Sequence, residues 1–260
     1  MTAPRTHSTR DRPRKTVPHK NQGDAATAIE AISAEVTACS RCPRLVAHRE
    51  HVARTKRRAF RDWIYWGKPL PGFGDPRARL LLIGLAPAAH GGNRTGRMFT
   101  GDRSGDWLYR ALHRAGFASQ AEATSVDDGL RLSGAYITAT VRCAPPDNQP
   151  TRVEIESCRN YLVRELEALA GVRVILALGK IAFDASLRVL LEHGAPVPRP
   201  APRFAHGAEV RFPSGWPCLI ASYHPSQHNT QTGRLTEAML DGVLEQVRRL
   251  LDGAPAHRRT

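Results

Sequence analysis

Residues 80–102 read LLLIGLAPAAHGGNRTGRMFTGD. The first six form a continuous apolar run of strand length, and a run without polar alternation is typical of a strand covered on both faces. The remainder is rich in glycine and small residues, which allow a backbone to approach a ligand closely. The stretch therefore predicts a buried strand that ends in a ligand-binding loop.

Three further apolar runs follow, at 135–141, 172–178 and 218–223. Amphipathic stretches that predict helices alternate with the four runs or flank them, at 25–36, 105–115, 152–170, 181–192 and 236–251. Strands that alternate with helices favour a parallel sheet. We therefore expect an α/β protein, a three-layer α/β/α sandwich with a central four-stranded parallel sheet.

The chain of 260 residues fits a single folded domain, which we place at 25–253. Residues 1–24 hold almost no large apolar side chains, so we expect a disordered basic tail there, and a flexible C-terminal tail at 254–260. No apolar run is long enough to span a bilayer, and the N-terminus lacks the apolar core of a signal peptide. A cytoplasmic protein without a membrane partner is expected.

The formal net charge is +14, and residues 1–24 contribute six basic residues against two acidic ones. Most of the positive excess therefore belongs to the folded part of the chain, where it can neutralise phosphates and release their counterions. This balance predicts a polyanionic partner. The alternative is a solvated surface charge in an arginine-rich protein.

The five cysteines are odd in number and unevenly spaced, which disfavours a disulfide framework. Cys39 and Cys42 form a Cys-x-x-Cys pair, and Cys143 and Cys158 lie far downstream. Four thiolates can hold a zinc ion or an iron-sulfur cluster, and the residue types alone leave the metal open. Alternatively, Cys143 and Cys158 are small buried hydrophobic residues, as we expect for Cys218 inside its apolar run.

Polar residues follow three of the expected strands: Asp102, Asn148 and His224. In open α/β sheets ligands bind beyond the carboxyl ends of the strands, so these residues are candidates for one site. Each also has a simpler interpretation, because Asp102 is suited to cap the helix that follows it and a lone histidine is more often structural.

Several motifs occur in a fixed order: Cys-x-x-Cys at 39–42, GLAPAAHG at 84–91, FTGD at 99–102, RCAPPDN at 142–148, Cys158, SYHP at 222–225 and NTQTGR at 229–234. Together they span almost the whole chain beyond the tail. In order and number they resemble the family 5 (UDGb-type) branch of the uracil-DNA glycosylase superfamily. The resemblance implies the four-stranded parallel sheet and a structural 4Fe-4S cluster held by Cys39, Cys42, Cys143 and Cys158.

The resemblance also implies the roles of the site residues. Asp102 would orient the attacking water and stabilise positive charge on the sugar, because Ala86 stands where other branches carry an aspartate. His224 would donate a hydrogen bond to the leaving base. Phe99 would stack on the flipped base and Asn148 would read its edge, with Gly84 and Ala86 as further substrate-binding residues.

The function implied is base-excision repair on double-stranded DNA, by hydrolysis of the N-glycosidic bond of uracil and of other deaminated or modified bases, such as hypoxanthine, hydroxymethyluracil or ethenocytosine. A monomer close to the nucleoid would suffice, since it acts at one lesion. The 223–234 segment would press into the minor groove, and the basic aromatic stretch at 54–68 is a weaker candidate for that contact. The alternatives are a non-catalytic iron-sulfur nucleic-acid-binding module and a zinc-stabilised hydrolase of free nucleosides.

Overall fold

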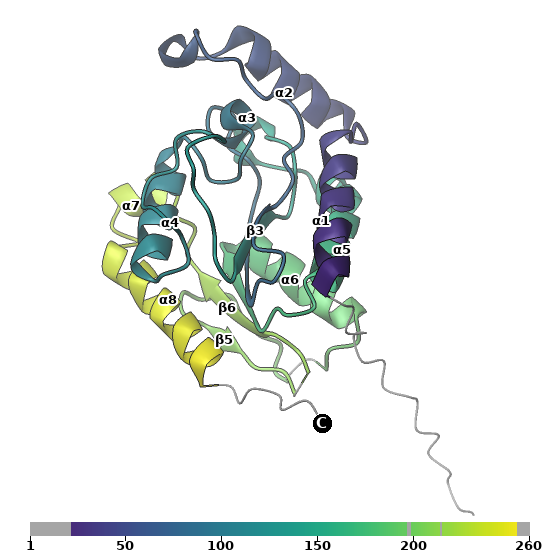
Figure 1. Ribbon diagram of the computed structural model, residues 1–260, viewed down its shortest axis with the longest axis vertical. Helices are drawn as coiled ribbons and strands as arrows, with labels where there is room; N and C mark the ends of the chain where they lie inside the picture. Colours follow the sequence, from purple (N-terminus) through teal and green to yellow (C-terminus); the bar gives the residue numbers. More distant parts are fainter. Residues whose placement is uncertain (1–21, 197–198, 214, 254–260) are drawn as a thin grey trace, which may run out of the picture.

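The four apolar runs form the centre of one six-stranded sheet with the order β1-β3-β2-β4-β6-β5 (Figure 1). The central strands pair in parallel and are β3 (Ala135–Ala139), β2 (Leu80–Gly84), β4 (Val174–Leu178) and β6 (Cys218–Ser222). The two edge strands, β1 (Phe73–Gly74) and β5 (Glu209–Val210), are antiparallel to their neighbours. The predicted four-stranded parallel sheet is confirmed, and two short edge strands extend it.

This computed structural model describes residues 22–196, 199–213 and 215–253. Helix α1 (Gln22–Thr37) begins three residues before the predicted start of the domain. The rest of the predicted basic tail and the predicted C-terminal tail at 254–260 lie outside the described residues. No helix within the described ranges is both long and apolar enough to cross a membrane.

Helices cover both faces of the sheet, which confirms the three-layer sandwich (Figure 1). One layer consists of α4 (Arg103–Arg114) and α8 (Glu237–Asp252), and the other of α1, α5 (Arg152–Ala168) and α6 (Lys180–Glu192). Leu80 and Leu82 of β2 pack into the core under the first layer, whereas Leu81 and Ile83 pack into the core under the second. Because side chains alternate along a strand, one apolar run serves two cores.

Four short helices lie in the loops beyond these layers: η1 (Arg58–Phe60), α3 (Gly92–Thr95), η2 (Pro146–Asn148) and α7 (Gln227–Gln231). A longer helix, α2 (Pro43–Thr55), crosses one end of the molecule, at the top of Figure 1. The sequence pattern does not predict α2. It buries only Leu45, Arg49 and Val52, a narrow stripe at spacings of four and three residues that one buried arginine interrupts.

A buried ion pair fixes the loop after β3 to helix α5. The Arg142 and Glu165 side chains are each 1% exposed, and the guanidinium donates two parallel hydrogen bonds, Nη1 to Oε1 at 3.0 Å and Nη2 to Oε2 at 2.5 Å. The Thr138 hydroxyl donates to the same Oε2 at 2.6 Å. Burial alone would lower the pKa of Arg142, but the carboxylate beside it raises the pKa, so the guanidinium stays charged.

We expect Glu165→Gln to lower the free energy of unfolding by about 3–5 kcal/mol, because it leaves the Arg142 charge buried without a partner. Glu167→Gln is the matched control on the same helix, since Glu167 is exposed and its loss should cost within about 0.5 kcal/mol. Urea unfolding of both variants measures the difference. Equal midpoints for the two variants would show that the buried pair contributes no stability.

Candidate active site and cysteine cluster

The predicted site residues lie in the loops that leave the carboxyl ends of the parallel strands. Gly84 is the last residue of β2, and His224 follows β6 by two residues. Asp102 precedes α4, and Asn148 ends η2 in the loop after β3. All four therefore lie at one edge of the sheet, as the order of the elements predicts.

The side chain of Phe99 contacts residues from two of these loops, Gly84 and His224. Its ring stacks at a tilt of 31° on the imidazole of His224, with 5.7 Å between the ring centroids. A Cβ atom on Gly84 would come within 2.9 Å of the Phe99 ring, so the ring lies directly against the β2 backbone. The carbonyl group of Phe99 would collide with any side chain at Gly105. Two glycines therefore make room for one aromatic residue.

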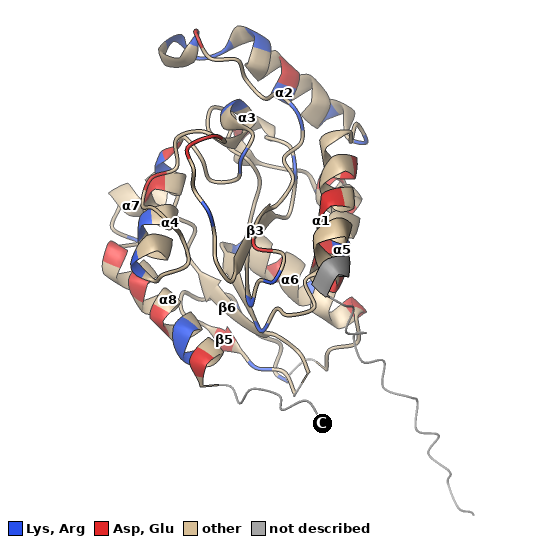
Figure 2. Cartoon of the chain, in the orientation of Figure 1, with Lys and Arg blue, Asp and Glu red and all other residues tan. Residues whose placement is uncertain are grey.

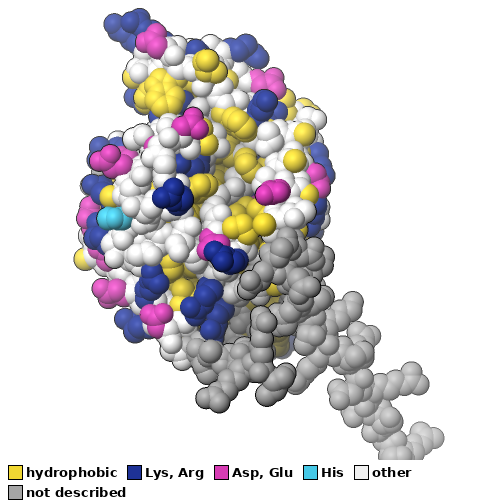
Figure 3. Space-filling model, in the orientation of Figure 1, with side chains coloured by type: hydrophobic (Ala, Val, Ile, Leu, Met, Phe, Trp, Pro, Cys, Tyr) yellow, Lys and Arg dark blue, Asp and Glu magenta, His cyan; other side chains and the backbone are white. Residues whose placement is uncertain are grey.

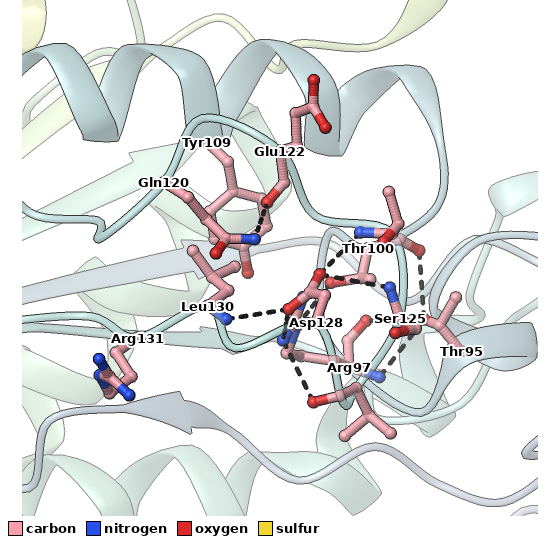
Figure 4. A network of polar contacts seen from close by, with 12 residues as sticks. Thr95, Arg97, Thr100, Tyr109, Gln120, Glu122, Ser125, Asp128, Leu130 and Arg131 are labelled. Carbon is pink, nitrogen blue, oxygen red and sulfur yellow. Dashed lines mark hydrogen bonds and ion pairs between the residues drawn. The ribbon is translucent and has the colours of Figure 1, made fainter.

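The backbone of Phe99 is held in a conformation that non-glycine residues rarely adopt, with φ at 53°. Such strain persists only where the surroundings determine the conformation. Figure 4 shows the side chain of Arg97, two residues earlier, directed at Asp128. The guanidinium forms two hydrogen bonds with that carboxylate, at 2.9 and 2.6 Å, and a third with the Thr100 hydroxyl at 2.9 Å.

The partner of this clamp is itself fixed. Asp128 accepts hydrogen bonds from the backbone amides of Thr124, Ser125 and Leu130 at 2.8, 3.3 and 3.0 Å (Figure 4). Burial alone would raise the pKa of Asp128, but Arg97 and these amides lower it below the ordinary range, so the carboxylate is ionised at neutral pH. The loop that carries Phe99 is therefore anchored to a second loop about 30 residues further on.

Asp102 caps helix α4, as the alternative interpretation predicts: its Oδ1 accepts from the Gly105 amide at 2.9 Å. Its second carboxylate oxygen packs against Gly91, where a side chain would clash. Burial raises the pKa of Asp102, while the amides of Gly105 and Ser104 act in the opposite direction. A carboxylate with a raised pKa is a stronger base, which suits Asp102 to accept a proton from water.

His224 is held by its backbone, because the Asn229 side chain donates to the His224 carbonyl at 2.9 Å. Burial lowers the pKa of the imidazole to about 4. A pKa this low favours the neutral ring at physiological pH. A neutral imidazole can donate one N–H hydrogen bond without carrying a charge.

Asn148 and Ala86 lie apart from the Phe99 contacts. Asn148 is exposed, has a φ of 55°, and within the described ranges its side-chain amide makes no hydrogen bond, so the amide is free to meet a ligand. Ala86 packs against the buried cluster that contains Cys143 and Cys158. The structure thus brings Gly84, Phe99 and His224 into contact and places Asp102 and Asn148 at the same edge of the sheet.

The four predicted ligand cysteines converge from three segments. Cys143 and Cys158 are buried together with Leu45, and Cys42 packs against them. None of the four is in a disulfide. Burial raises the pKa of the Cys143 thiol to about 12, Arg49 opposes this, and the other three cysteines add to it, which places all four thiols within electrostatic range of one another.

Two further contacts bind these segments together. Arg44, two residues after Cys42, donates to both carboxylate oxygens of Glu154 at 2.8 and 2.7 Å, and Glu154 lies one helical turn before Cys158. The Arg142–Glu165 pair holds the residue next to Cys143 on the same helix. Helix α5 therefore positions all three cysteine-bearing segments.

The donor set does not match one small metal ion. A tetrahedral zinc about 2.3 Å from each sulfur would draw four thiolates to within about 4 Å of one another. In the part of the chain that the structure describes, no three or more His, Cys, Asp or Glu side chains are grouped to hold a metal ion. A buried positive charge lies within electrostatic range of Cys143: Arg49 is 5% exposed, its Nη2 lies 3.6 Å from a carboxylate oxygen of Glu50, and its Nε and Nη1 have no hydrogen-bond partner. A polynuclear anionic cluster would offset this charge.

Comparison with known proteins identifies relatives along most of the chain. The family model described as the uracil DNA glycosylase superfamily matches residues 71–248. The type-5 uracil-DNA glycosylase of Thermus thermophilus is 54% identical over 221 residues, which cover 85% of this chain and 97% of that protein. The type-5 enzymes of Mycobacterium tuberculosis and Pyrobaculum aerophilum are 50% and 46% identical, covering 86% and 80% of this chain and 82% and 87% of those proteins.

Sequence reasoning missed the residues that support the site. Arg97 and Asp128 are far apart in the chain, so no spacing signals their pairing. The burial of Arg49 could not be predicted, because α2 itself was not predicted. Gly105 carries a usable signal, since a glycine in the first turn of a helix costs stability and suggests a close contact.

We expect the imidazole of His224 to titrate at about 4 in the folded protein. The unfolded chain takes up this proton near pH 6.5, so the contribution of His224 to stability is complete above that pH and is lost as the pH falls towards 4. NMR of the ring protons measures the pKa, and His224→Gln should remove part of the pH dependence of unfolding in this window. A titration near 6.5 would contradict the buried neutral ring.

Proposed function

Because this chain belongs to the uracil DNA glycosylase superfamily, we propose that it removes uracil from double-stranded DNA by hydrolysing the bond between base and deoxyribose. The observation that carries this proposal is the Phe99 ring lying between Gly84 and His224, three residues before Asp102. An aromatic face, a neutral donor and a basic carboxylate are the groups that hydrolysis of an extruded base requires.

The base would be bound by stacking and by hydrogen bonds. Phe99 offers an aromatic face for the flipped base, and its strained backbone keeps that face fixed before the substrate arrives. The exposed amide of Asn148 can both donate to and accept from the Watson-Crick edge of uracil. Because the loops converge only at this edge of the sheet, the nucleotide must leave the duplex to reach them.

The carboxylate of Asp102 would act on water and on the sugar. As the glycosidic bond lengthens, its electron pair goes to the base and positive charge grows on the deoxyribose, which the carboxylate stabilises electrostatically. Water then adds to the anomeric carbon and its proton passes to Asp102. The Gly105 amide holds Oδ1, so this proton is accepted at Oδ2, against Gly91.

His224 would stabilise the leaving group. The departing electron pair spreads onto the uracil oxygens, and a neutral imidazole can donate a hydrogen bond to one of them as the charge develops. The low pKa of about 4 keeps the ring neutral, so it donates this hydrogen bond without carrying a charge. The base then departs as an anion and is protonated by solvent.

The four convergent cysteines, Cys39, Cys42, Cys143 and Cys158, are proposed to hold a 4Fe-4S cluster. Support comes from the packing of Cys42, Cys143 and Cys158 in one apolar cluster, from the electrostatic effect of the other three cysteines on Cys143, and from Arg49, whose Nε and Nη1 are buried without hydrogen-bond partners. When bound, the cluster would crosslink the segment before α2, the loop after β3 and helix α5. No electron transfer is needed for the hydrolysis.

The enzyme is also proposed to accept other damaged bases, such as hypoxanthine, hydroxymethyluracil and ethenocytosine. The loop after β2 carries Ala86, Ala88 and Ala89, and such small side chains leave space that a bulkier residue would fill. One lesion requires one active site, so we propose a monomer that acts in the cytoplasm at the nucleoid.

We expect Asp102→Asn to slow uracil release from a uracil-guanine duplex by about 10²–10⁴-fold, and His224→Gln by about 10²–10³-fold. Single-turnover base release measures both, and the wild type is also assayed on duplexes that carry each of the other three bases. Asparagine still caps a helix, so Asp102→Asn should fold. Thr236→Asn is the matched control, because Thr236 caps α8 with its side chain and lies outside the site.

Full activity in both site variants would remove the catalytic assignment and leave a nucleic-acid-binding module. Release of uracil alone would refute the broad base range without affecting the main proposal. Activity restricted to free nucleosides would instead indicate a nucleoside hydrolase.

We expect the purified protein to contain about four irons per chain with equal sulfide, and Cys143→Ser to lose most of this iron. Arg49→Met, which keeps the apolar stem and removes the charge, should lose iron faster to a chelator. Metal analysis and visible absorption measure both effects. Cys218→Ser is the control, because Cys218 lies in β6 and packs into a different core.

Zinc in place of iron would contradict the cluster. So would equal iron in the Cys143 and Cys218 variants.

A further inference from the structure

An apolar ridge stands on the surface beside the candidate active site. It occupies residues 57–68, directly after α2, and its side chains are Phe60, Trp63, Ile64 and Trp66. Ile64 is 93% exposed, and Trp63 and Trp66 are each 37% exposed. Neighbouring exposed apolar side chains of this size are uncommon on a monomer and usually mark a binding surface.

Basic side chains lie around the apolar side chains of the ridge. Between residues 51 and 68 there are six lysines and arginines and one acid, Asp62. The exposed members are Arg54, Arg57, Arg58, Arg61 and Lys68. Figure 2 shows basic residues recurring along α2 and the turn after it, and Figure 3 shows hydrophobic and basic side chains next to one another at this end of the molecule.

Arg94 fixes the ridge to the active-site loop. Its guanidinium lies between the rings of Phe60 and Trp63, 3.9 and 4.1 Å from their centroids. The same side chain donates to the carbonyl of Gly101 at 2.7 Å, and Gly101 is the residue before Asp102. A single buried arginine therefore contacts the ridge and the neighbour of the candidate catalytic carboxylate.

Three more hydrogen bonds hold the ridge on the same loop. The amide of Trp66 donates to the Arg94 carbonyl and the amide of Gly67 to the Asn93 carbonyl, each at 3.0 Å. The Tyr65 hydroxyl lies 3.1 Å from Nδ1 of His90. Both sides of Ile64 are thus anchored, and the exposed side chain is presented from a fixed backbone.

We propose that the ridge binds the DNA duplex beside the extruded nucleotide, with Ile64 inserted between base pairs as a wedge. Apolar side chains used in this way unstack a base step and bend the duplex. The surrounding arginines would neutralise the phosphates on either side. This inference rests on the proposed function, since it supposes that one nucleotide occupies the site next to Gly101.

Charge distinguishes DNA from a protein partner. The cores of protein interfaces are depleted in charge, whereas this ridge is bordered by five exposed basic groups. The ridge is also joined through Arg94 to Gly101, two residues after Phe99, which places it next to the loop that would hold the extruded base. The duplex itself is therefore the occupant that fits both the charge and the position.

The test uses a duplex with a tetrahydrofuran abasic site and 2-aminopurine as the next base, so that it requires no catalysis. With wild-type protein, insertion of Ile64 should raise the 2-aminopurine fluorescence by unstacking. Ile64→Ala should reduce this rise and weaken binding about tenfold, in proportion to the lost apolar burial. Ile64→Asp should weaken it further, because a carboxylate would meet the bases.

Val153→Ala is the matched control, since Val153 is 75% exposed on α5, far along the chain from the ridge. Arg58→Ala with Arg61→Ala should reduce the slope of log affinity against log salt by about two. Equal fluorescence and affinity in wild type, Ile64→Ala and Val153→Ala would overturn the inference. Failure of the proposed function gives a different result, because the wild-type protein would then release no uracil.

Discussion

The loop that carries Cys143 and Asn148 is positioned by a pair of charges that is almost completely shielded from solvent. Arg142 and Glu165 are each 1% exposed, and their two parallel hydrogen bonds fix both the distance and the orientation between the loop after β3 and helix α5. An apolar pair could give equal stability, since the cost of removing two charges from water offsets most of their attraction. Unlike an apolar pair, the ion pair fixes the orientation of the loop after β3 relative to helix α5. Cys143 directly follows Arg142, and Asn148 lies further along the same loop, so both inherit their placement from this contact.

The ligand loop after β2 is fixed in a different way. The two positions that contact Phe99 most closely are glycines, which have no side chain to collide with it. Gly84 and Gly105 each leave out a Cβ atom that would collide with Phe99, and the φ of Phe99 is 53°. Both features cost folding free energy. The bidentate contact between Arg97 and Asp128 offsets that cost and prevents the loop from relaxing. A rigid loop loses little further conformational entropy when a base binds. The strain therefore lowers the stability of the fold but reduces the entropic cost of substrate binding.

The sequence predicts the sheet better than its surroundings, for physical reasons. A run such as 80–85 must be buried on both faces because nothing polar interrupts it, and the structure buries every residue of β2. Asp102 and His224 could be assigned to one edge because parallel strands all end there. In contrast, edge strands of two residues such as β1 carry no periodicity. Helix α2 carries little periodic signal, because only Leu45 and Val52 among its apolar side chains are buried and the charged Arg49 lies between them. The pairing of Arg97 with Asp128 has no local signal at all.

Helix α2 connects the two halves of the site, which explains how a cluster without a redox role could matter for DNA. It begins one residue after Cys42 and ends two residues before the ridge. Midway, the carbonyl of Arg49 accepts a hydrogen bond from Asn93 in the ligand loop at 3.1 Å. Crosslinking the cysteines would therefore fix the start of α2, and α2 in turn would fix the ridge and the loop that carries Phe99. Because few apolar side chains of α2 are buried, packing alone holds this helix weakly, and the proposed cluster would add a covalent anchor at its first turn.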